Sequence, residues 1–434
     1  MTAPLPRALQ AYRLALSAAA PLTALLLRQR LVRGKEIDAR LCERRGEGTL
    51  PRPDGPLVWL HAASVGELMS VLPLIERISG RGLTMLVTSG TVTSSEIAAQ
   101  RMPPGVIHQF VPLDVPRFAG RFLDHWRPQL ALFVESDLWP NLLIETARRD
   151  VPMVLLNARL SERSFRRWQR LPQFIGHLLQ GFDLCLARTG ADAERLTRLG
   201  GRKVVVSGNL KLDVPAPPAD AAALAALQNA VGARPVMAAA STHPGEDELV
   251  IAAHKRLRAG TPGLLTLIAP RHPERGPQIA ALARAAGLNA AVRSENALPD
   301  AATEIYVADT MGELGLLYRL TPVVFIGGSL IPHGGQNPIE PAKLGAAIVH
   351  GPHVANFQEL YAELDAAHGA ELVADGDRLA AALGALLTQP VLRERVARAG
   401  HEVVEALGGA LERTMQALEP YLDPLQHRQD AHHA

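Results

Sequence analysis

The chain has 434 residues, which predicts two domains at roughly 100–200 residues per domain. Lys and Arg number 45 against 43 Asp and Glu, and the resulting net charge of +2 excludes a strongly basic nucleic-acid binder and a polyanionic tail protein. Hydrophobic residues make up 47% of the chain, so a large core is available and global disorder is excluded. The two cysteines, Cys42 and Cys185, form no disulfide framework or cysteine-based zinc site and suit a reducing compartment.

The first 45 residues carry nine basic and three acidic side chains around an uncharged run at 14–27. This run is interrupted by Pro21 and is shorter than the roughly 20 apolar residues that span a bilayer. It continues into Arg28 and Arg30 where a secretory signal would have a small-residue cleavage site. We therefore predict an N-terminal membrane-associating helix whose basic flank meets anionic headgroups on the cytoplasmic side. The alternative is a hydrophobic helix packed on the body of the protein.

From residue 55 onward, short apolar runs alternate with Gly-, Ser- or Pro-bearing loops and helical periodicity, which predicts an α/β fold with parallel, helix-covered sheets. A Pro-rich stretch near 214–218 separates two such series. The predicted strands are 57–60, 83–88, 130–134, 153–156, 184–187 and 204–207, then 236–240, 264–269, 305–308, 323–326 and 347–349.

Two Rossmann-like doubly wound domains facing a central cleft follow from this alternation, and ligands of such sheets bind beyond the carboxyl ends of the strands. The helical stretch near 391–418 could close the second domain or cross back to the first. The predicted segments are a membrane-anchor segment at 1–45, an N-terminal Rossmann-like domain at 46–213, a linker at 214–233, a C-terminal Rossmann-like domain with a terminal helix at 234–421, and a disordered tail at 422–434.

The strand-end loops of the first domain carry three candidate catalytic residues. Glu67 ends the string HAASVGE after the first strand, where a carboxylate can accept a proton from a hydroxyl; the alternative is a first-turn Glu that complements the helix dipole. Glu135 begins ESDLWPN, in which Asp137 could share acid and base roles, or Asp137 or Asn141 could cap the next helix. Lys211, in GNLKLD, could neutralise a phosphate or carboxylate, or could be an ordinary surface lysine.

The second domain carries four candidate ligand-binding loops after predicted strands. The string ASTHPGE at 240–246 opens a helix and predicts an anion site, and Arg271 could hold a phosphate. The loop DTMGE at 309–313 begins another helix, and glycines at 327–328 and 334–335 let the backbone approach a ligand. Asn337 stands in helix-cap position, and Glu340 could accept hydrogen bonds from a ribose. Together these loops predict a nucleotide site.

No GxxxxGK[ST] loop, CxxC or HExxH motif is present, so an ATPase is disfavoured and metal-independent chemistry is the expectation. Transfer of a glycosyl group from a nucleotide-activated sugar needs a base and stabilisation of the leaving phosphate, and the loops offer both.

At these loops the sequence resembles the 3-deoxy-D-manno-octulosonic acid (Kdo) transferases of lipopolysaccharide biosynthesis, glycosyltransferase family 30. The order and spacing of the matching strings agree from about residue 25 to residue 420. The strings are HAASVGE (61–67), ESDLWP (135–140), NARLS (157–161), GNLK (208–211), STHPGE (241–246), APRHPE (269–274), DTMGEL (309–314), GGSL (327–330) and GGQNPIEP (334–341).

The resemblance implies a GT-B inverting enzyme that transfers Kdo from CMP-Kdo to a lipid A precursor, lipid IVA, at the cytoplasmic side of the inner membrane, with no metal, cofactor or nucleic acid. It implies Glu67 as the general base and Glu135 and Lys211 as transition-state stabilisers. It also implies a set of residues around CMP: Pro270, Arg271, Met311, Gly312, Glu313, Asn337, Pro338, Ile339 and Glu340.

Two positions depart from the family's pattern, because Asp137 stands where many relatives have Glu and Gln336 replaces a usual His. Three rival functions stay open at this point: a sugar-nucleotide epimerase of the same architecture, a non-catalytic binding protein, and a transferase using a UDP-sugar.

Overall fold

The computed structural model describes residues 4–136 and 138–433, and the chain divides into two compact units. The first unit comprises Met1–Val214 and Gly408–Ala434, and the second comprises Pro215–Leu407. The predicted position of the linker, at 214–233, therefore includes the boundary, but residues 221–231 form helix α10 (Ala221–Val231) of the second unit.

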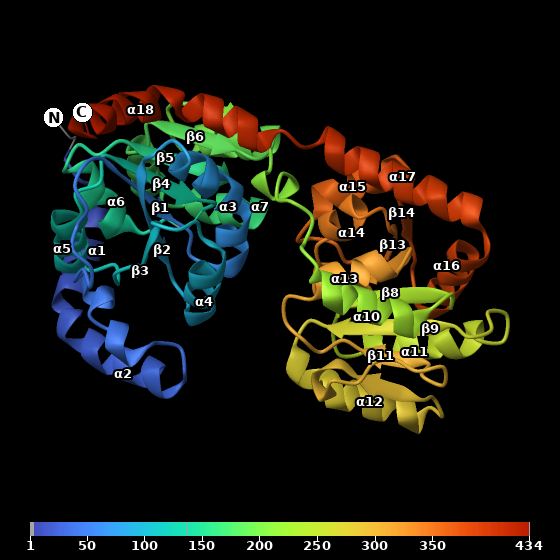
Figure 1. Ribbon diagram of the computed structural model, residues 1–434. Coiled ribbons are helices and arrows are strands. Elements are labelled where there is room, and N and C mark those ends of the chain that lie inside the picture. The colour runs from blue at the N-terminus through green and yellow to red at the C-terminus, as the bar shows by residue number, and fades with distance from the viewer. Residues whose placement is uncertain (1–3, 137, 434) are drawn as a thin grey trace. The chain divides into compact units, whose positions relative to one another are not determined.

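The first unit contains a seven-stranded sheet in the order β3-β2-β1-β4-β5-β6-β7, and all of its strands are parallel (Figure 1). This order is that of a doubly wound sheet, whose ligand-binding edge lies at the carboxyl ends of the strands. The strands are β1 (Leu57–His61), β2 (Thr84–Ser89), β3 (Ile107–Phe110), β4 (Leu130–Val134), β5 (Met153–Ala158), β6 (Leu184–Ala187) and β7 (Val204–Val206).

Helices cover both faces of this sheet because its central strands are apolar on both sides. On one face, Trp59 and Phe133 pack against the helices that carry Phe122 and Leu179; on the other, Leu60 packs with α3 and with the C-terminal helix. The helices of the sheet's layers are α3 (Val65–Ser79), α4 (Val92–Arg101), α5 (Pro116–Trp126), α6 (Pro140–Ala147), α7 (Glu162–Trp168), α8 (Pro172–Gln180), α9 (Gly190–Arg198) and α18 (Ala410–His433).

The second unit repeats the architecture with a parallel sheet in the order β10-β11-β9-β8-β12-β13-β14. Its strands are β8 (Val236–Thr242), β9 (Leu265–Pro270), β10 (Ala290–Val292), β11 (Ile305–Val307), β12 (Val323–Ile326), β13 (Ala347–His350) and β14 (Ala370–Leu372). Its remaining helices are α11 (Glu246–Leu257), α12 (Gly276–Ala285), α13 (Leu314–Leu320), α14 (Ile339–Lys343), α15 (Gln358–Ala366), α16 (Gly376–Thr388) and α17 (Pro390–Ala406).

The C-terminal helix differs from the prediction in two ways. It belongs to the first unit, so the chain crosses back after Leu407 and the predicted domain 234–421 is wrong at its end. It also extends beyond residue 421, where a disordered tail was expected, because Leu422 and Leu425 are buried in the core of the first unit beside Met415 and Leu418. Pro420 and Pro424 lie inside the helix without ending it.

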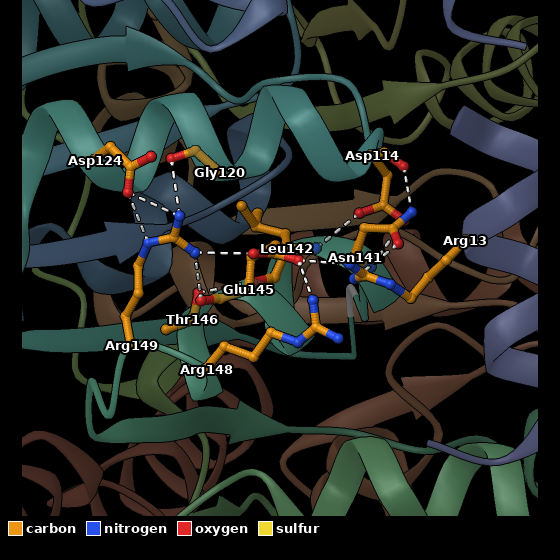
Figure 2. Close-up of polar contacts among 10 residues, drawn as sticks. All are labelled: Arg13, Asp114, Gly120, Asp124, Asn141, Leu142, Glu145, Thr146, Arg148 and Arg149. Atoms are coloured by element: carbon orange, nitrogen blue, oxygen red, sulfur yellow. Dashed lines mark hydrogen bonds and ion pairs between the residues drawn. The ribbon is translucent and has the colours of Figure 1, made fainter. Parts of the chain in front are cut away.

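The N-terminal helices α1 (Arg7–Ala18) and α2 (Thr23–Val32) are fixed to the first unit by buried leucines and by polar contacts. Leu9 and Leu27 are buried, and the Tyr12 hydroxyl donates to Asp114 over 2.8 Å. Figure 2 shows Arg13 of α1 reaching Asn141 and Glu145 of α6, and the ion pair with Glu145 is 2.6 Å long. The alternative prediction, a hydrophobic N-terminal helix packed on the body of the protein, is therefore confirmed for the buried side chains of this segment.

Other apolar side chains of these two helices and of the 3₁₀ turn between them (Ala20–Leu22) are exposed. In the part of the chain that the structure describes, no helix is long and apolar enough to span a bilayer. The exposed residues are Leu14, Leu22, Leu25, Leu26 and Val32.

Candidate active site

Glu67 lies in the first turn of α3, directly after β1. The Ser64 hydroxyl caps this helix by accepting from the Glu67 amide over 3.3 Å. In return, the Glu67 carboxylate accepts from the Ala63 amide (2.8 Å) and from the Ser64 hydroxyl (3.0 Å). This reciprocal capping is a variant of the one that a Ser-x-x-Glu spacing predicts, because the carboxylate bonds to the amide of Ala63 and not to that of the cap residue Ser64. The half-buried carboxylate supports the start of the helix whatever else it does.

Glu135 and Lys211 were singled out separately and are joined in the structure. Lys211 Nζ donates to Glu135 Oε1 over 2.8 Å, and both side chains are partly exposed. Glu135 follows β4 with a left-handed φ of 60°, a conformation that costs a non-glycine residue about 1–3 kcal/mol and concentrates at functional sites. Because β1 and β4 are neighbours, this ion pair lies at the same edge of the sheet as Glu67.

Lys211 is held by the backbone around it. It lies in a short 3₁₀ turn (Leu210–Leu212) that Asn209 caps, and the Leu210 amide donates to the side chain of Asn157 over 3.1 Å. Asn157 is the second-last residue of β5 and has a φ of 49° at an irregularity in the strand pairing. The turn therefore connects Lys211 to the carboxyl end of the central sheet, which distinguishes it from an ordinary surface lysine.

The carboxylate pair expected at 135–137 cannot be described in full, since Asp137 lies outside the described residues. Asn141 does not cap α6 with its own side chain. Instead Asp114 accepts from the backbone amides of Asn141 (3.2 Å) and Leu142 (3.0 Å), and the Asn141 amide group donates back to the Asp114 carbonyl over 2.6 Å (Figure 2). Burial raises the pKa of the Asp114 carboxyl.

In the second unit, a buried carboxylate joins the predicted loop at 240–246 to the loop at 328–330. The fully buried Glu246 carboxylate accepts from four backbone amides: His243 (3.1 Å), Gly328 (2.6 Å), Ser329 (3.0 Å) and Leu330 (3.0 Å). The Thr242 hydroxyl donates to Asp247 over 2.6 Å, and Asp247 also pairs with Arg275. The His243 amide and the Thr242 hydroxyl of the predicted loop are therefore bonded to carboxylates of the chain itself, and an anion site at this loop stays a prediction.

The remaining predicted nucleotide residues lie in loops after β9, β11 and β12, and with β8 these four strands are adjacent in the sheet. Arg271 is anchored by its amide to the Thr242 carbonyl over 3.0 Å, and within the described chain its exposed guanidinium enters no ion pair. Pro270 ends β9 opposite Thr242. Met311 is 69% exposed, and Gly312 has a φ of 81°.

Two carboxylates of this set have opposite environments. Arg293 donates to Glu313 through two hydrogen bonds of 2.9 and 3.0 Å and holds the pKa of that carboxyl below its usual range. Burial instead raises the pKa of Glu340, whose Oε1 accepts from the side-chain amide of Asn337 over 3.2 Å. Asn337 Oδ1 accepts from the Ile339 amide (3.0 Å) at the start of α14, but the cap position of this helix is taken by Pro338, so Asn337 stands one residue before the predicted cap position. Pro338 is the residue before this helix.

Sequence reasoning missed a group of imidazoles at this edge. The His243 and His333 rings lie 3.8 Å apart between centroids, and Gln336 Nε2 lies 3.0 Å from His243 Nε2. Burial, assisted by the positive charge of nearby His333, His272 and Arg271, lowers the pKa of His243 to about 4. The signal available in the sequence was the histidine in both STHPGE and IPHGG. Among the described residues no group of three or more His, Cys, Asp or Glu side chains is placed to hold a metal ion.

Two parallel, doubly wound α/β units with polar strand-end loops define a GT-B glycosyltransferase fold. A solved UDP-N-acetylglucosamine 2-epimerase has this fold as well: its TM-score is 0.60 at 12% identity, over 86% of this chain and 97% of that chain, which shows a shared fold alone.

The family described as 3-deoxy-D-manno-octulosonic-acid transferase matches residues 35–214. A 3-deoxy-D-manno-octulosonic acid transferase of Bordetella pertussis is 37% identical over 95% of this chain and 99% of its own length. The protein of the same name from Haemophilus influenzae is 35% identical over 90% of this chain and 93% of its own. The chain belongs to the 3-deoxy-D-manno-octulosonic acid transferase family.

Proposed function

We propose that the chain transfers Kdo, with inversion, from CMP-Kdo to the lipid A precursor lipid IVA in the assembly of the lipopolysaccharide inner core. The observation that carries this proposal is the family membership, because relatives named for Kdo transfer align with almost the full length of the chain. The two-domain architecture alone would equally suit an epimerase.

In this proposal Glu67 is the general base. It takes the proton of an acceptor hydroxyl, the hydroxyl oxygen bonds to the anomeric carbon of Kdo, and the bond from that carbon to the CMP phosphate breaks. Two features support Glu67 in this role: it lies at the carboxyl edge of the sheet, and the amide of Ala63 and the hydroxyl of Ser64 orient its carboxylate.

The Glu135–Lys211 pair is proposed to stabilise the transition state, with the Lys211 ammonium facing negative charge that develops on the leaving phosphate. Residues 270–271, 311–313 and 337–340 are proposed to surround CMP, and the unpaired guanidinium of Arg271 suits a phosphate. These cations supply the electrostatic stabilisation that a metal would otherwise give, so transfer should persist in the presence of EDTA.

We also propose that the protein binds the cytoplasmic surface of the inner membrane through α1 and α2. The exposed leucines of these helices and the basic residues at 28–35 match an in-plane anchor, while Leu9, Tyr12 and Arg13 attach the segment to the enzyme. Co-sedimentation with anionic vesicles should fall in a Leu22→Ser, Leu25→Ser variant. Equal binding by the variant would contradict the proposal, as would equal binding to neutral vesicles.

The central test is transfer of Kdo from freshly generated CMP-Kdo to a tetraacylated lipid A precursor by the wild type and by Glu67→Gln. Glutamine can still accept from Ala63 and so keeps the helix start, whereas it cannot act as a base. We expect turnover to fall by about 10²–10⁴-fold with unchanged CMP affinity and unfolding temperature. A folded, CMP-binding wild type that transfers no Kdo would refute the function, and full activity in Glu67→Gln would refute the base.

A further inference from the structure

We propose that a cavity of about 440 Å³ in the second unit binds the sugar acid of the donor, with the imidazoles of His333 and His353 donating to its carboxylate. The inference rests on the proposed function and assigns residues that the proposed CMP site does not use. The cavity lies between the segment after β12 and the segment after β13. It is lined by Pro332, His333, Gly334, Pro352, His353, Val354, Ala355, Asn356 and Gln358.

The cavity is built by backbone contacts between its two walls. The His353 amide donates to the Ser329 carbonyl over 2.9 Å, and the Asn356 amide donates to the Gly334 carbonyl over 2.8 Å. The side-chain amide of Asn356 also donates to the carbonyl of Gly335 over 3.2 Å. These contacts fix the spacing of the walls before any ligand arrives, which reduces the cost of ordering on binding.

Glycine is required where the two walls approach most closely. Gly334 has a φ of 102°, and a Cβ there would lie 2.8 Å from Asn356. At Gly351 a Cβ would lie 2.2 Å from the carbonyl oxygen of Ser329. At Gly351 a side chain would force the backbone of the facing wall to move, and at Gly334 the positive φ itself disfavours any other residue, although the Asn356 side chain could shift. The backbone of the two walls is therefore closely matched at Gly351.

The lining suits an anionic polyhydroxy ligand. None of its nine residues is acidic, two are histidines, and Asn356 and Gln358 carry amide groups that can bond to hydroxyls. The exposed His333 and His353 rings are within reach of a ligand in the cavity. A carboxylate in contact with an imidazole favours its protonated form, and the resulting charge-assisted hydrogen bonds are about twice as strong as neutral ones.

Behind the cavity, His243 and Gln336 support the His333 ring. The His243 ring lies against His333, and the lowered pKa of His243 keeps its own ring neutral at neutral pH. A neutral His243 ring can accept from the Gln336 amide at Nε2. The backbone carbonyl of Gln336 accepts in turn from the buried Tyr361 hydroxyl over 3.0 Å, and this bond connects Gln336 to α15.

The position along the chain also fits a donor sugar. Gly334 precedes the proposed nucleotide residue Asn337 by three residues in the same loop. Because the sugar of a sugar nucleotide is joined to the phosphate by a single linkage, its binding site must adjoin the nucleotide site. This cavity does so through a shared loop.

The test compares the full-length wild type with the double variant His333→Asn, His353→Asn and with His368→Asn as a control. His368 is exposed, lies outside the cavity and has a φ of 54°, which asparagine adopts readily. We expect the double variant to raise the KM for CMP-Kdo at least about tenfold. The affinity for CMP alone and the KM for the lipid acceptor should change less than twofold, and the control should match the wild type.

Three results would overturn the inference: an unchanged KM for CMP-Kdo, an equal loss of CMP affinity, or a raised KM for the acceptor, which would assign the cavity to an anionic group of that lipid. If the wild type transfers no Kdo, the proposed function fails separately. Thermal unfolding then decides the inference, because CMP-Kdo should protect the wild type more than CMP does and should lose that advantage in the double variant. Equal protection by both ligands in the wild type would also overturn it.

Discussion

The two units share a parallel, doubly wound sheet but hold their strand-end groups in different ways. In the first unit, the candidate catalytic groups are partly exposed: Lys211 pairs with Glu135, and Glu67 bonds to the Ser64 hydroxyl. In the second unit, a fully buried carboxylate organises the strand-end backbone, because Glu246 accepts from four amides of two loops. The partly exposed groups of the first unit should thus be removable with loss of activity alone, whereas removal of the buried Glu246 carboxylate should cost stability.

The largest effect is expected from Glu246→Ala. The substitution leaves four buried amide donors without their acceptor, and we expect it to lower the free energy of unfolding by about 4 kcal/mol and to abolish CMP binding. Denaturant unfolding and calorimetry with CMP measure the two quantities. The control is Glu248→Ala, two residues away on the exposed face of α11, where a single amide contact is lost and about 1 kcal/mol is expected. An equal decrease in the free energy of unfolding in both variants would show that Glu246 does not organise the loops.

Lys211→Met tests the first unit, where removal of a partly exposed group should reduce activity and leave stability unchanged. We expect transfer to slow by about 100-fold, which corresponds to about 2.7 kcal/mol of lost transition-state stabilisation. The free energy of unfolding should change by less than about 1 kcal/mol, because the ion pair with Glu135 is partly exposed. Arg77→Met breaks the exposed pair with Glu412 in the same unit and should leave both quantities nearly unchanged. A large loss of stability in Lys211→Met with normal turnover per folded molecule would assign Lys211 a structural role.

The sequence predicted the central strands well because they are continuous apolar runs, and it missed β3, β10 and β14. All three missed strands lie at sheet edges, where one side is not covered by another strand. They are short, and β3 contains His108 and Gln109, so that no apolar run marks it. The C-terminal helix was cut short for a similar reason, since Pro420 and Pro424 concealed the helical spacing of Leu418, Leu422 and Leu425.

The positions of the candidate residues at strand ends could be predicted from their loops, but the partners of these residues could not. Glu135 and Lys211 are separated by 76 residues, and only the sheet brings them together. The loop that contains Glu246 was predicted, yet the sequence did not indicate that its carboxylate accepts from backbone amides 82 to 84 residues further along the chain. The Ser-x-x-Glu cap at Glu67 is local and was available in the sequence, which explains why local contacts are the part of a site that can be predicted.

The smallest effect concerns stability at acid pH, and it compares one imidazole with a lowered pKa in each unit: the buried His243 and the half-buried His108. The pKa of His243 is lowered to about 4 by burial and nearby positive charge, and that of His108 in the first unit is lowered to about 3 by burial, Arg40 and Arg44. The unfolded chain binds a proton to each ring near pH 6.5, so each ring favours unfolding as the pH falls below about 6.5 and has no effect above it.

For His243 this contribution is about 2 kcal/mol at pH 5. Unfolding free energies at pH 7.5 and 5 for the wild type and His243→Asn should therefore show the variant losing about 2 kcal/mol less on acidification. His108→Asn should behave in the same way. The reductions in the free energy of unfolding lost on acidification should add in the double variant, because the residues belong to different units. Parallel pH profiles for the wild type and His243→Asn would mean that the His243 ring is not held neutral, and the support it gives to His333 would then be lost.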